Sequence, residues 1–317
     1  MQRKHFIRNS LLAGASVLSG AAVAAGKTDD PKNSSNGKAR RAGNKPAGQP
    51  FNLNYGIHDG MFRNSAGSDF IDQIKFAYDQ GFRSIEDNGM SHRPPEQQQK
   101  IGDTLAKLGM SMGVFVLDKG GNGANTLAAG KPEFIEIFLK GCRDAVDVSK
   151  RCGGTLTTVV PGDFERHLPM GIQTGNIIDA LRRGVEILEP HKIVMVLEPL
   201  SDTPDLFLRD SDQAYAICRA INSPSCKILF DMYHIQRNQG NLIRNIDHTY
   251  SEIGYFQIGN NPGRNEPTTG EMDYRNIFKH IYDKGYKGVL GMEHGNARPG
   301  KEGEMALIQA YRDSDKF

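Results

Sequence analysis

The chain has 317 residues, of which 38% are hydrophobic and 24% are charged, and its formal net charge is +2. This composition predicts an ordinary soluble protein that is long enough to bury a large core. The near-neutral charge gives no indication of a nucleic acid or an anionic membrane surface as a partner.

The first 26 residues have the layout of an export signal peptide. A basic start, MQRKHFIR, precedes a run of fifteen small or apolar residues, LLAGASVLSGAAVAA, which ends in small residues suited to cleavage. The run is shorter than the roughly 20 residues of a membrane span, so we expect no stable span, although an uncleaved anchor is the alternative. RKHFIR resembles a twin-arginine signal with Lys4 in place of the second arginine, and general secretion also stays open. We therefore predict a periplasmic or extracellular location.

Residues 27–50 are predicted to be a disordered linker, because they lack apolar periodicity and are rich in Lys, Asn, Gly and Pro. The four cysteines follow later, at spacings that fit no zinc motif. Cys142 and Cys218 fall in helical stretches among apolar neighbours. We expect all four to be buried free thiols rather than disulfides.

From residue 51 to residue 317 the chain alternates between short apolar runs and helical stretches. The expected strands are 53–58, 82–87, 112–118, 155–160, 193–200, 227–233, 254–259 and 288–294. The expected helices are 68–80, 94–108, 131–151, 174–190, 210–221, 239–251, 273–284 and 303–313. Uniformly apolar strands are typical of a parallel sheet that is covered on both faces. Eight such units predict an α/β fold, a (β/α)₈ TIM barrel, rather than an open doubly wound sheet, whose glycine-rich fingerprint is missing after the first strand.

Polar residues end four successive strands in the second half of the predicted barrel. They are Glu198, Asp231, Gln257 and Glu293, at separations of 33, 26 and 36 residues. The active site of a TIM barrel lies at the carboxyl ends of its strands, so these side chains should meet in one pocket. Three carboxylates repel one another unless a cation lies among them, and four oxygen donors suit a hard divalent ion. The pattern predicts one bound cation, Mn²⁺ or Mg²⁺.

Four segments carry a resemblance to a known family: LEP at 197–199, FDMYHIQ at 230–236, FQIGNNPGRNEPTTGEMDY at 256–274 and GMEHG at 291–295. The chain resembles the sugar isomerase/epimerase family of xylose-isomerase-like TIM barrels, and within it the hydroxypyruvate isomerase group. The resemblance implies that the four strand-end residues are the metal ligands and that Glu198 and Glu293 also move protons. It further implies that His234 and Arg264 contact the substrate.

Three further residues are weaker candidates for substrate binding. His58 and Glu86 end the first and second strands, so they either line the same mouth or serve the fold. Glu266, in RNEP, either orients Arg264 or caps its loop. His294 points the opposite way from Glu293 along the strand and is left out. The GGNG segment at 120–123 is predicted to be a mobile lid, since it lacks the Lys-Ser/Thr of a phosphate-binding loop.

These residues predict an enzyme that isomerises or epimerises a small hydroxycarbonyl compound through an enediolate, an aldose–ketose isomerase type of chemistry. The expected partner is a small carbohydrate or hydroxy-keto acid, and a homo-oligomer is possible. One alternative is an exported lyase that eliminates a leaving group from keto-sugars or keto-glycosides at the same metal site. Another is a carbohydrate-binding barrel without catalysis, which Glu198 and Glu293 argue against. A three-zinc endonuclease should carry many more histidine ligands and a basic groove.

Overall fold

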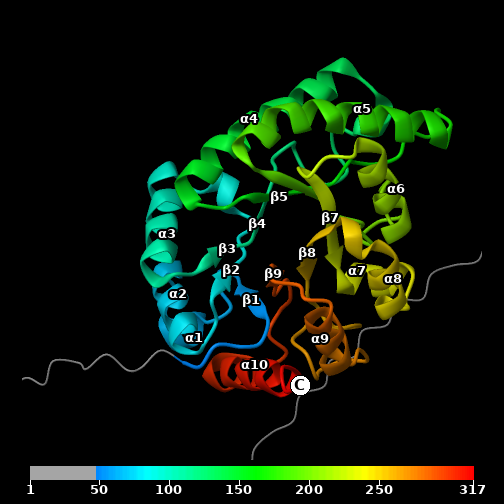
Figure 1. The fold of residues 1–317 in the computed structure, drawn as a ribbon. Helices are drawn as coiled ribbons and strands as arrows, with labels where there is room; N and C mark the ends of the chain where they lie inside the picture. The colour runs from blue at the N-terminus through cyan, green and yellow to red at the C-terminus, as the bar shows by residue number, and fades with distance from the viewer. Residues whose placement is uncertain (1–47) are drawn as a thin grey trace, which may run out of the picture. The chain divides into compact units, whose positions relative to one another are not determined.

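The computed structural model describes residues 48–317, in which one parallel sheet curls into a barrel inside a ring of helices (Figure 1). The predicted export signal and almost all of the predicted linker lie outside the described residues. The strands are β1 Asn54–Ile57, β2 Ser84–Ile85, β3 Ser111–Met112, β4 Val114–Val116, β5 Leu156–Val159, β6 Val194–Leu197, β7 Cys226–Asp231, β8 Ile253–Gln257 and β9 Val289–Gly291. Their order around the sheet is β3-β2-β1-β9-β8-β7-β6-β5-β4.

The two ends of this sheet belong to one continuous segment, so the ring is nearly closed. β3 pairs with β2, β4 pairs with β5, and only Gly113 separates β3 from β4. The predicted third strand is therefore one strand of the barrel that bends at Gly113, so that its first part pairs with β2 and its second part with β5. Glycine is required at the bend, because a Cβ at this position would overlap the hydroxyl of Tyr255. With β3 and β4 counted as one bent strand, the eight-stranded barrel that the sequence predicts is confirmed.

All eight predicted helices are present, and they cover the outside of the barrel (Figure 1). The α-helices are α1 Arg63–Ala66, α2 Phe70–Asp79, α3 Pro95–Leu108, α4 Pro132–Cys152, α5 Met170–Leu188, α6 Ser211–Ile221, α7 Met232–Asn238, α8 Leu242–Thr249, α9 Tyr274–Asp283 and α10 Gly300–Ser314. Short 3₁₀ turns are η1 Met90–His92, η2 Leu127–Ala129, η3 Glu189–His191 and η4 Tyr250–Glu252. The short helices α1 and α7 were not predicted. At α7 the predicted strand 227–233 was two residues too long, because the strand ends at Asp231 and the helix begins at once.

Alternation along the strands separates two apolar layers. Ile228 and Phe230 of β7 point outward into the large core between the sheet and the helices. Leu229 points the other way and packs with side chains of four other strands, which fill the interior of the barrel: Val114, Val196, Tyr255 and Val289. Side chains two positions further along the same strands point to the same side of the sheet and lie at the carboxyl end of the barrel interior.

Two further expectations concern the described part of the chain. All four cysteines are free and buried, which confirms the prediction of buried thiols. Between residues 48 and 317, no helix combines the length and the apolar character that crossing a bilayer requires.

Candidate active site

The strand alternation brings the predicted site residues together at the carboxyl ends of β6 to β9. Asp231 and Gln257 are the last residues of β7 and β8, and the sheet register places them side by side. Glu198 follows β6 by one residue and Glu293 follows β9 by two. Each of these side chains lies an even number of positions after an interior residue of its strand, so all four open onto the top of the barrel interior.

Asp231 has two functions because its two carboxylate oxygens face different ways. Its Oδ1 accepts hydrogen bonds from the main-chain N–H of Tyr233 at 2.7 Å and of His234 at 3.4 Å, and so caps the first turn of α7. Its Oδ2 lies 3.1 Å from Nη2 of Arg264. The side chain is fully buried. An aspartate therefore ends this apolar strand because one oxygen starts a helix while the other remains available to the site.

His234 is held as a hydrogen-bond donor rather than as a metal ligand. Its Nδ1 accepts from the main-chain N–H of Ser201 at 3.2 Å and lies 2.8 Å from the Ser201 hydroxyl. Since a main-chain N–H only donates, the proton of the neutral ring is on Nε2, which lies 3.5 Å from Oδ2 of Asp231. Burial lowers the pKa of His234 and favours this neutral form. Glu198, Asp231 and His234 offer atoms within 4.8 Å of one another, but a protonated Nε2 cannot bind a cation.

Arg264 brings a positive charge into the carboxylate cluster. Its Nη2 lies 2.6 Å from Oε2 of Glu293 as well as 3.1 Å from Asp231, and its Nε donates to the main-chain oxygen of Glu293 at 3.1 Å. The guanidinium also lies over the ring of Tyr233, 4.8 Å from its centre. The residue predicted to contact substrate thus offsets part of the negative charge of the site and retains further donors for an anionic ligand.

Glu198 and Glu293 have the perturbed acidities expected of groups that transfer protons. Burial, followed by the negative charges of Glu293 and Asp231, raises the pKa of Glu198 well above its ordinary value. Burial and the charges of Glu86 and Asp231 also raise the pKa of Glu293, while Arg264 opposes the rise. Glu293 keeps 28% of its side chain exposed, so water moderates its shift more than that of the buried Glu198.

In the side-chain amide of Gln257, the nitrogen makes a hydrogen bond and the oxygen makes none. Its Nε2 donates to Oε1 of Glu86 at 3.0 Å, whereas its Oε1 is buried without a hydrogen-bond partner. Glu86 also accepts from the hydroxyl of Tyr255 at 2.9 Å, and burial raises the pKa of Glu86 to about 7. A buried amide oxygen without a donor is costly and calls for a ligand.

The donor set fits a hard divalent cation. The free Oε1 of Gln257 lies at the end of the strand next to Asp231. Glu198 offers an oxygen within 4.8 Å of Asp231, whereas Glu293 lies outside that group and is paired with Arg264. A cation would satisfy the amide oxygen and relieve the repulsion between the carboxylates that raises their pKa values. Mn²⁺ and Mg²⁺ prefer oxygen ligands of this kind, and the absence of thiolate among the four predicted donors disfavours softer ions.

Two of the weaker candidates, His58 and Glu266, differ in position: the first lines a cavity at the mouth and the second is buried. His58 lies at the mouth, where it lines a cavity of about 300 Å³ together with Glu86 and Glu293. Its ring nitrogens lie 2.9 and 3.0 Å from the main-chain oxygens of Asp59 and His294. Glu266 is buried, and its Oε2 accepts from the N–H of Ala297 at 2.8 Å, so it holds the loop that follows β9. This contact is with a different loop from the one that carries Arg264, and the two roles that the sequence left open for Glu266 stay predictions.

His294 and the GGNG loop at 120–123, which the sequence analysis did not count among the ligands, contact other parts of the protein. His294 turns away from the site, as predicted, and its Nε2 lies 2.7 Å from the hydroxyl of Tyr311. Next to the GGNG segment, the buried ammonium of Lys119 donates to the main-chain oxygen of Gly121 at 3.1 Å and to that of Ala124. The loop thus folds around a lysine, and its action as a lid stays a prediction.

Sequence reasoning missed three residues that hold the predicted ones. Asn88 donates from Nδ2 to Oε1 of Glu293 at 2.7 Å. Ser201 fixes the ring of His234, and Tyr255 binds Glu86. Asn88 and Ser201 follow strand ends, so the rule that found Glu198 could have found them, but Tyr255 is indistinguishable from a core tyrosine in the sequence.

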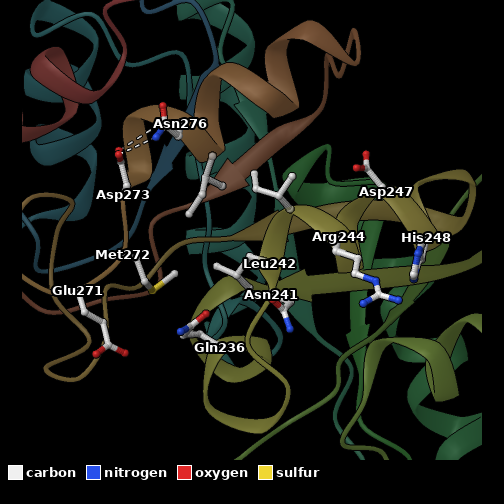
Figure 2. A pocket seen from close by; sticks show the side chains of 12 residues that line it. Gln236, Asn241, Leu242, Arg244, Asp247, His248, Glu271, Met272, Asp273 and Asn276 are labelled. Atoms are coloured by element: carbon white, nitrogen blue, oxygen red, sulfur yellow. Dashed lines mark hydrogen bonds between the residues drawn. The ribbon is translucent and has the colours of Figure 1, made fainter.

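A second cavity, of about 630 Å³, lies between α8 and α9 and the loop that precedes α9 (Figure 2). Its wall contains Arg244 and His248 of α8 on one side and Glu271 and Asp273 on the other. None of the predicted site residues lines it. We place the active site at the barrel mouth, because the perturbed carboxylates and the free amide oxygen are there.

The sequence is similar to proteins of known name. A family described as "Xylose isomerase-like TIM barrel" matches residues 74–313. The hydroxypyruvate isomerase of Escherichia coli (strain K12) is 33% identical over 161 residues, which are 50% of this chain and 62% of that protein. The 2-oxo-tetronate isomerase of Pectobacterium atrosepticum is 29% identical over 237 residues, which are 71% of this chain and 86% of that protein.

Solved structures agree on the fold. The crystal structure of an AP endonuclease of family 2 from Brucella melitensis superposes with a TM-score of 0.69, at 20% identity, over 82% of this chain and 99% of that chain. Identity this low supports the barrel architecture alone, and the site itself must carry the argument for function.

Proposed function

Because this chain belongs to the xylose isomerase-like TIM-barrel family, we propose that it is a metal-dependent isomerase or epimerase of a small hydroxycarbonyl compound, of the hydroxypyruvate isomerase type. The observation that carries this proposal is the free Oε1 of Gln257 at the strand end beside Asp231, at the barrel mouth where Glu198 and Glu293 have raised pKa values. The substrate is a small hydroxy-keto acid or ketose.

Four side chains would hold the cation: Glu198, Asp231, Gln257 through Oε1, and Glu293. A bound Mn²⁺ or Mg²⁺ would polarise the substrate carbonyl and stabilise the negative charge of the enediolate. The neighbouring Glu86 and Asn88 hold Gln257 and Glu293 in place, so that the donors are oriented before a ligand arrives.

Glu198 and Glu293 transfer the proton. One carboxylate takes the proton from the carbon that bears the hydroxyl group, and the electron pair of the broken C–H bond forms the enediolate. Return of a proton to the neighbouring carbon, together with transfer of the hydroxyl proton to the former carbonyl oxygen, completes an isomerisation. Return of a proton to the opposite face of the same carbon completes an epimerisation. Without a bound cation, burial and mutual repulsion hold the pKa values of both carboxylates above those of ordinary glutamates, and a carboxylate with a raised pKa is a stronger base for a weakly acidic carbon.

His234 and Arg264 position the substrate. The Nε2–H of His234 donates to a substrate oxygen, because Ser201 holds the opposite nitrogen as an acceptor. Arg264 clamps a substrate carboxylate with the guanidinium N–H groups that its own ion pairs leave over. A carboxylate next to the reacting carbonyl, as in a keto acid, suits this pair of donors.

The second candidate is a lyase that acts on keto-sugars or keto-glycosides. The predicted export signal favours it, since hydroxypyruvate is an intracellular metabolite. The same carboxylate removes the same kind of proton, but the electron pair then expels a leaving group from the adjacent carbon. The two reactions therefore share every residue up to the second step.

Proton exchange distinguishes the candidates. The purified protein with Mn²⁺ is incubated in D₂O with hydroxypyruvate, with common ketoses and with keto-glycosides, and the products are followed by NMR. Deuterium on the α-carbon without loss of a leaving group supports the isomerase, and release of an aglycone supports the lyase. Binding of any of these compounds with neither outcome would leave a carbohydrate-binding barrel and refute both enzymatic proposals.

A further inference from the structure

We propose that Glu86 is a positioning residue that fixes the side-chain amide of Gln257, so that its oxygen and not its nitrogen faces the cation site. This inference rests on the proposed metal site and assigns Glu86 a role other than the substrate contact expected from the sequence. The relevant contacts join Glu86, which follows β2 by one residue, to Gln257 and Tyr255 of β8, which lie 171 and 169 positions further along the chain.

Both hydrogen bonds of the Glu86 carboxylate join it to other side chains of the barrel. Its Oε1 accepts from Nε2 of Gln257 at 3.0 Å and its Oε2 accepts from the hydroxyl of Tyr255 at 2.9 Å. Both neighbours donate, so the carboxylate serves as acceptor on both sides. Only 1% of the residue is exposed. Glu86 therefore acts through Gln257.

Rotation of the Gln257 amide by half a turn is the alternative that Glu86 prevents. It would place the amide oxygen against Oε1 of Glu86, where two acceptors repel, and would turn the NH₂ group toward the carboxylate cluster. A neutral amide nitrogen has no lone pair to offer a cation. The orientation seen here leaves Oε1 buried and without a partner, as a ligand atom requires.

The barrel makes room for this carboxylate at a specific place. A Cβ on Gly291, in β9, would overlap Oε2 of Glu86, so glycine there lets the glutamate reach across the interior. Burying a carboxylate is costly unless it is fully bonded. The glycine, the tyrosine donor and the glutamine donor together build a pocket for one carboxylate directly behind a predicted ligand.

The test measures cation affinity with Mn²⁺ alone, by calorimetry and by the EPR signal of free Mn²⁺. Glu86→Met removes the acceptor at similar volume and should weaken Mn²⁺ binding by about 10–100-fold. Glu86→Gln keeps an oxygen that can accept from Gln257, so binding should stay within about a few-fold of wild type. Glu252→Gln is the matched control: it is a buried glutamate paired with Lys227 and Arg219 at the start of β8, far along the strand from the site.

A double-mutant cycle separates positioning from a general structural role. If Glu86 acts only through the amide, Glu86→Met should add little to the loss of Mn²⁺ affinity in Gln257→Leu. Additive losses would overturn the inference, and so would unchanged affinity in Glu86→Met. Should Glu86→Met fail to fold, Tyr255→Phe removes one of the two donors on Glu86 and should still weaken binding, and unchanged affinity in that variant would overturn it. Failure of wild type to bind Mn²⁺ would instead refute the proposed metal site.

Discussion

The two halves of the barrel contribute to the site in different ways. The second half, from β6 to β9, supplies the four predicted ligands and also His234 and Arg264. The first half supplies residues that hold them, since Glu86 bonds Gln257 and Asn88 bonds Glu293. One half of a repeating architecture can thus supply the proposed ligands while the other half fixes the orientation of their side chains.

Substitution of a proton carrier in the second half should have the largest effect. Glu293→Gln keeps the size of the side chain and one acceptor oxygen, which can serve either Asn88 or Arg264, but it cannot take a proton at neutral pH. We expect deuterium exchange into the substrate to fall by about 10²–10⁴-fold with the fold retained. NMR exchange rates with circular dichroism as the fold control check this, and near-full exchange would exclude Glu293 as a proton carrier. Glu133→Gln, on the exposed first turn of α4, is the control.

Asp231 permits the next test, because its helix cap and its proposed contact with a cation use different oxygens. Asp231→Asn can still cap α7 with its side-chain oxygen but loses the charge, so Mn²⁺ affinity should fall by about 10–100-fold at a nearly unchanged helix content. Asp231→Ala loses the cap as well, so its free energy of unfolding should lie about 1 kcal/mol below that of the Asn variant. Equal Mn²⁺ affinity in wild type and Asp231→Asn would remove Asp231 from the ligand set.

Asn88 tests the supporting half of the comparison through pH. Burial raises the pKa of Glu293, and the base must be deprotonated to act, so activity should rise as the pH increases through that pKa. The N–H of Asn88 favours the ionised form of Glu293, and its removal in Asn88→Ala should raise the pKa further. The acidic limb of the kcat/KM profile should therefore move to higher pH, while the rate on the plateau changes only about a few-fold. An acidic limb that stays in place would show that Asn88 does not act through Glu293.

The same contrast explains what could be predicted from the sequence. The ligands of the second half end apolar strands, and a polar side chain in that position is visible without coordinates. The supporting contacts join residues 169 to 205 positions apart, such as Tyr255 with Glu86 and Asn88 with Glu293, and depend on how the barrel closes. Closure in turn depends on the bend at Gly113, where one predicted strand pairs on two sides.

The start of α7 was missed for a related reason. Met232 and Tyr233 continue the apolar run of β7, so the pattern predicts strand, but the Asp231 carboxylate accepts from the following N–H groups and begins a helix there. The side chain that marks the site is thus the one that ends the strand. The contact between Glu266 and Ala297 could not be predicted either, because no sequence pattern indicates that these two loops meet.

Ser201 offers a small expected effect and the sharpest version of the comparison, because it lies in the second half but holds another residue. Its hydroxyl and its main-chain N–H both contact Nδ1 of His234. Ser201→Ala removes only the hydroxyl, and the remaining N–H still keeps the proton on Nε2, so we expect kcat/KM to fall by no more than about tenfold with Mn²⁺ affinity unchanged. Calorimetry and steady-state kinetics on the same preparation check both parts. A loss as large as that of Glu293→Gln would mean that Ser201 itself contacts the substrate. Every residue of the second half tested in this comparison would then act on the substrate or the cation, and the supporting residue would lie in the first half.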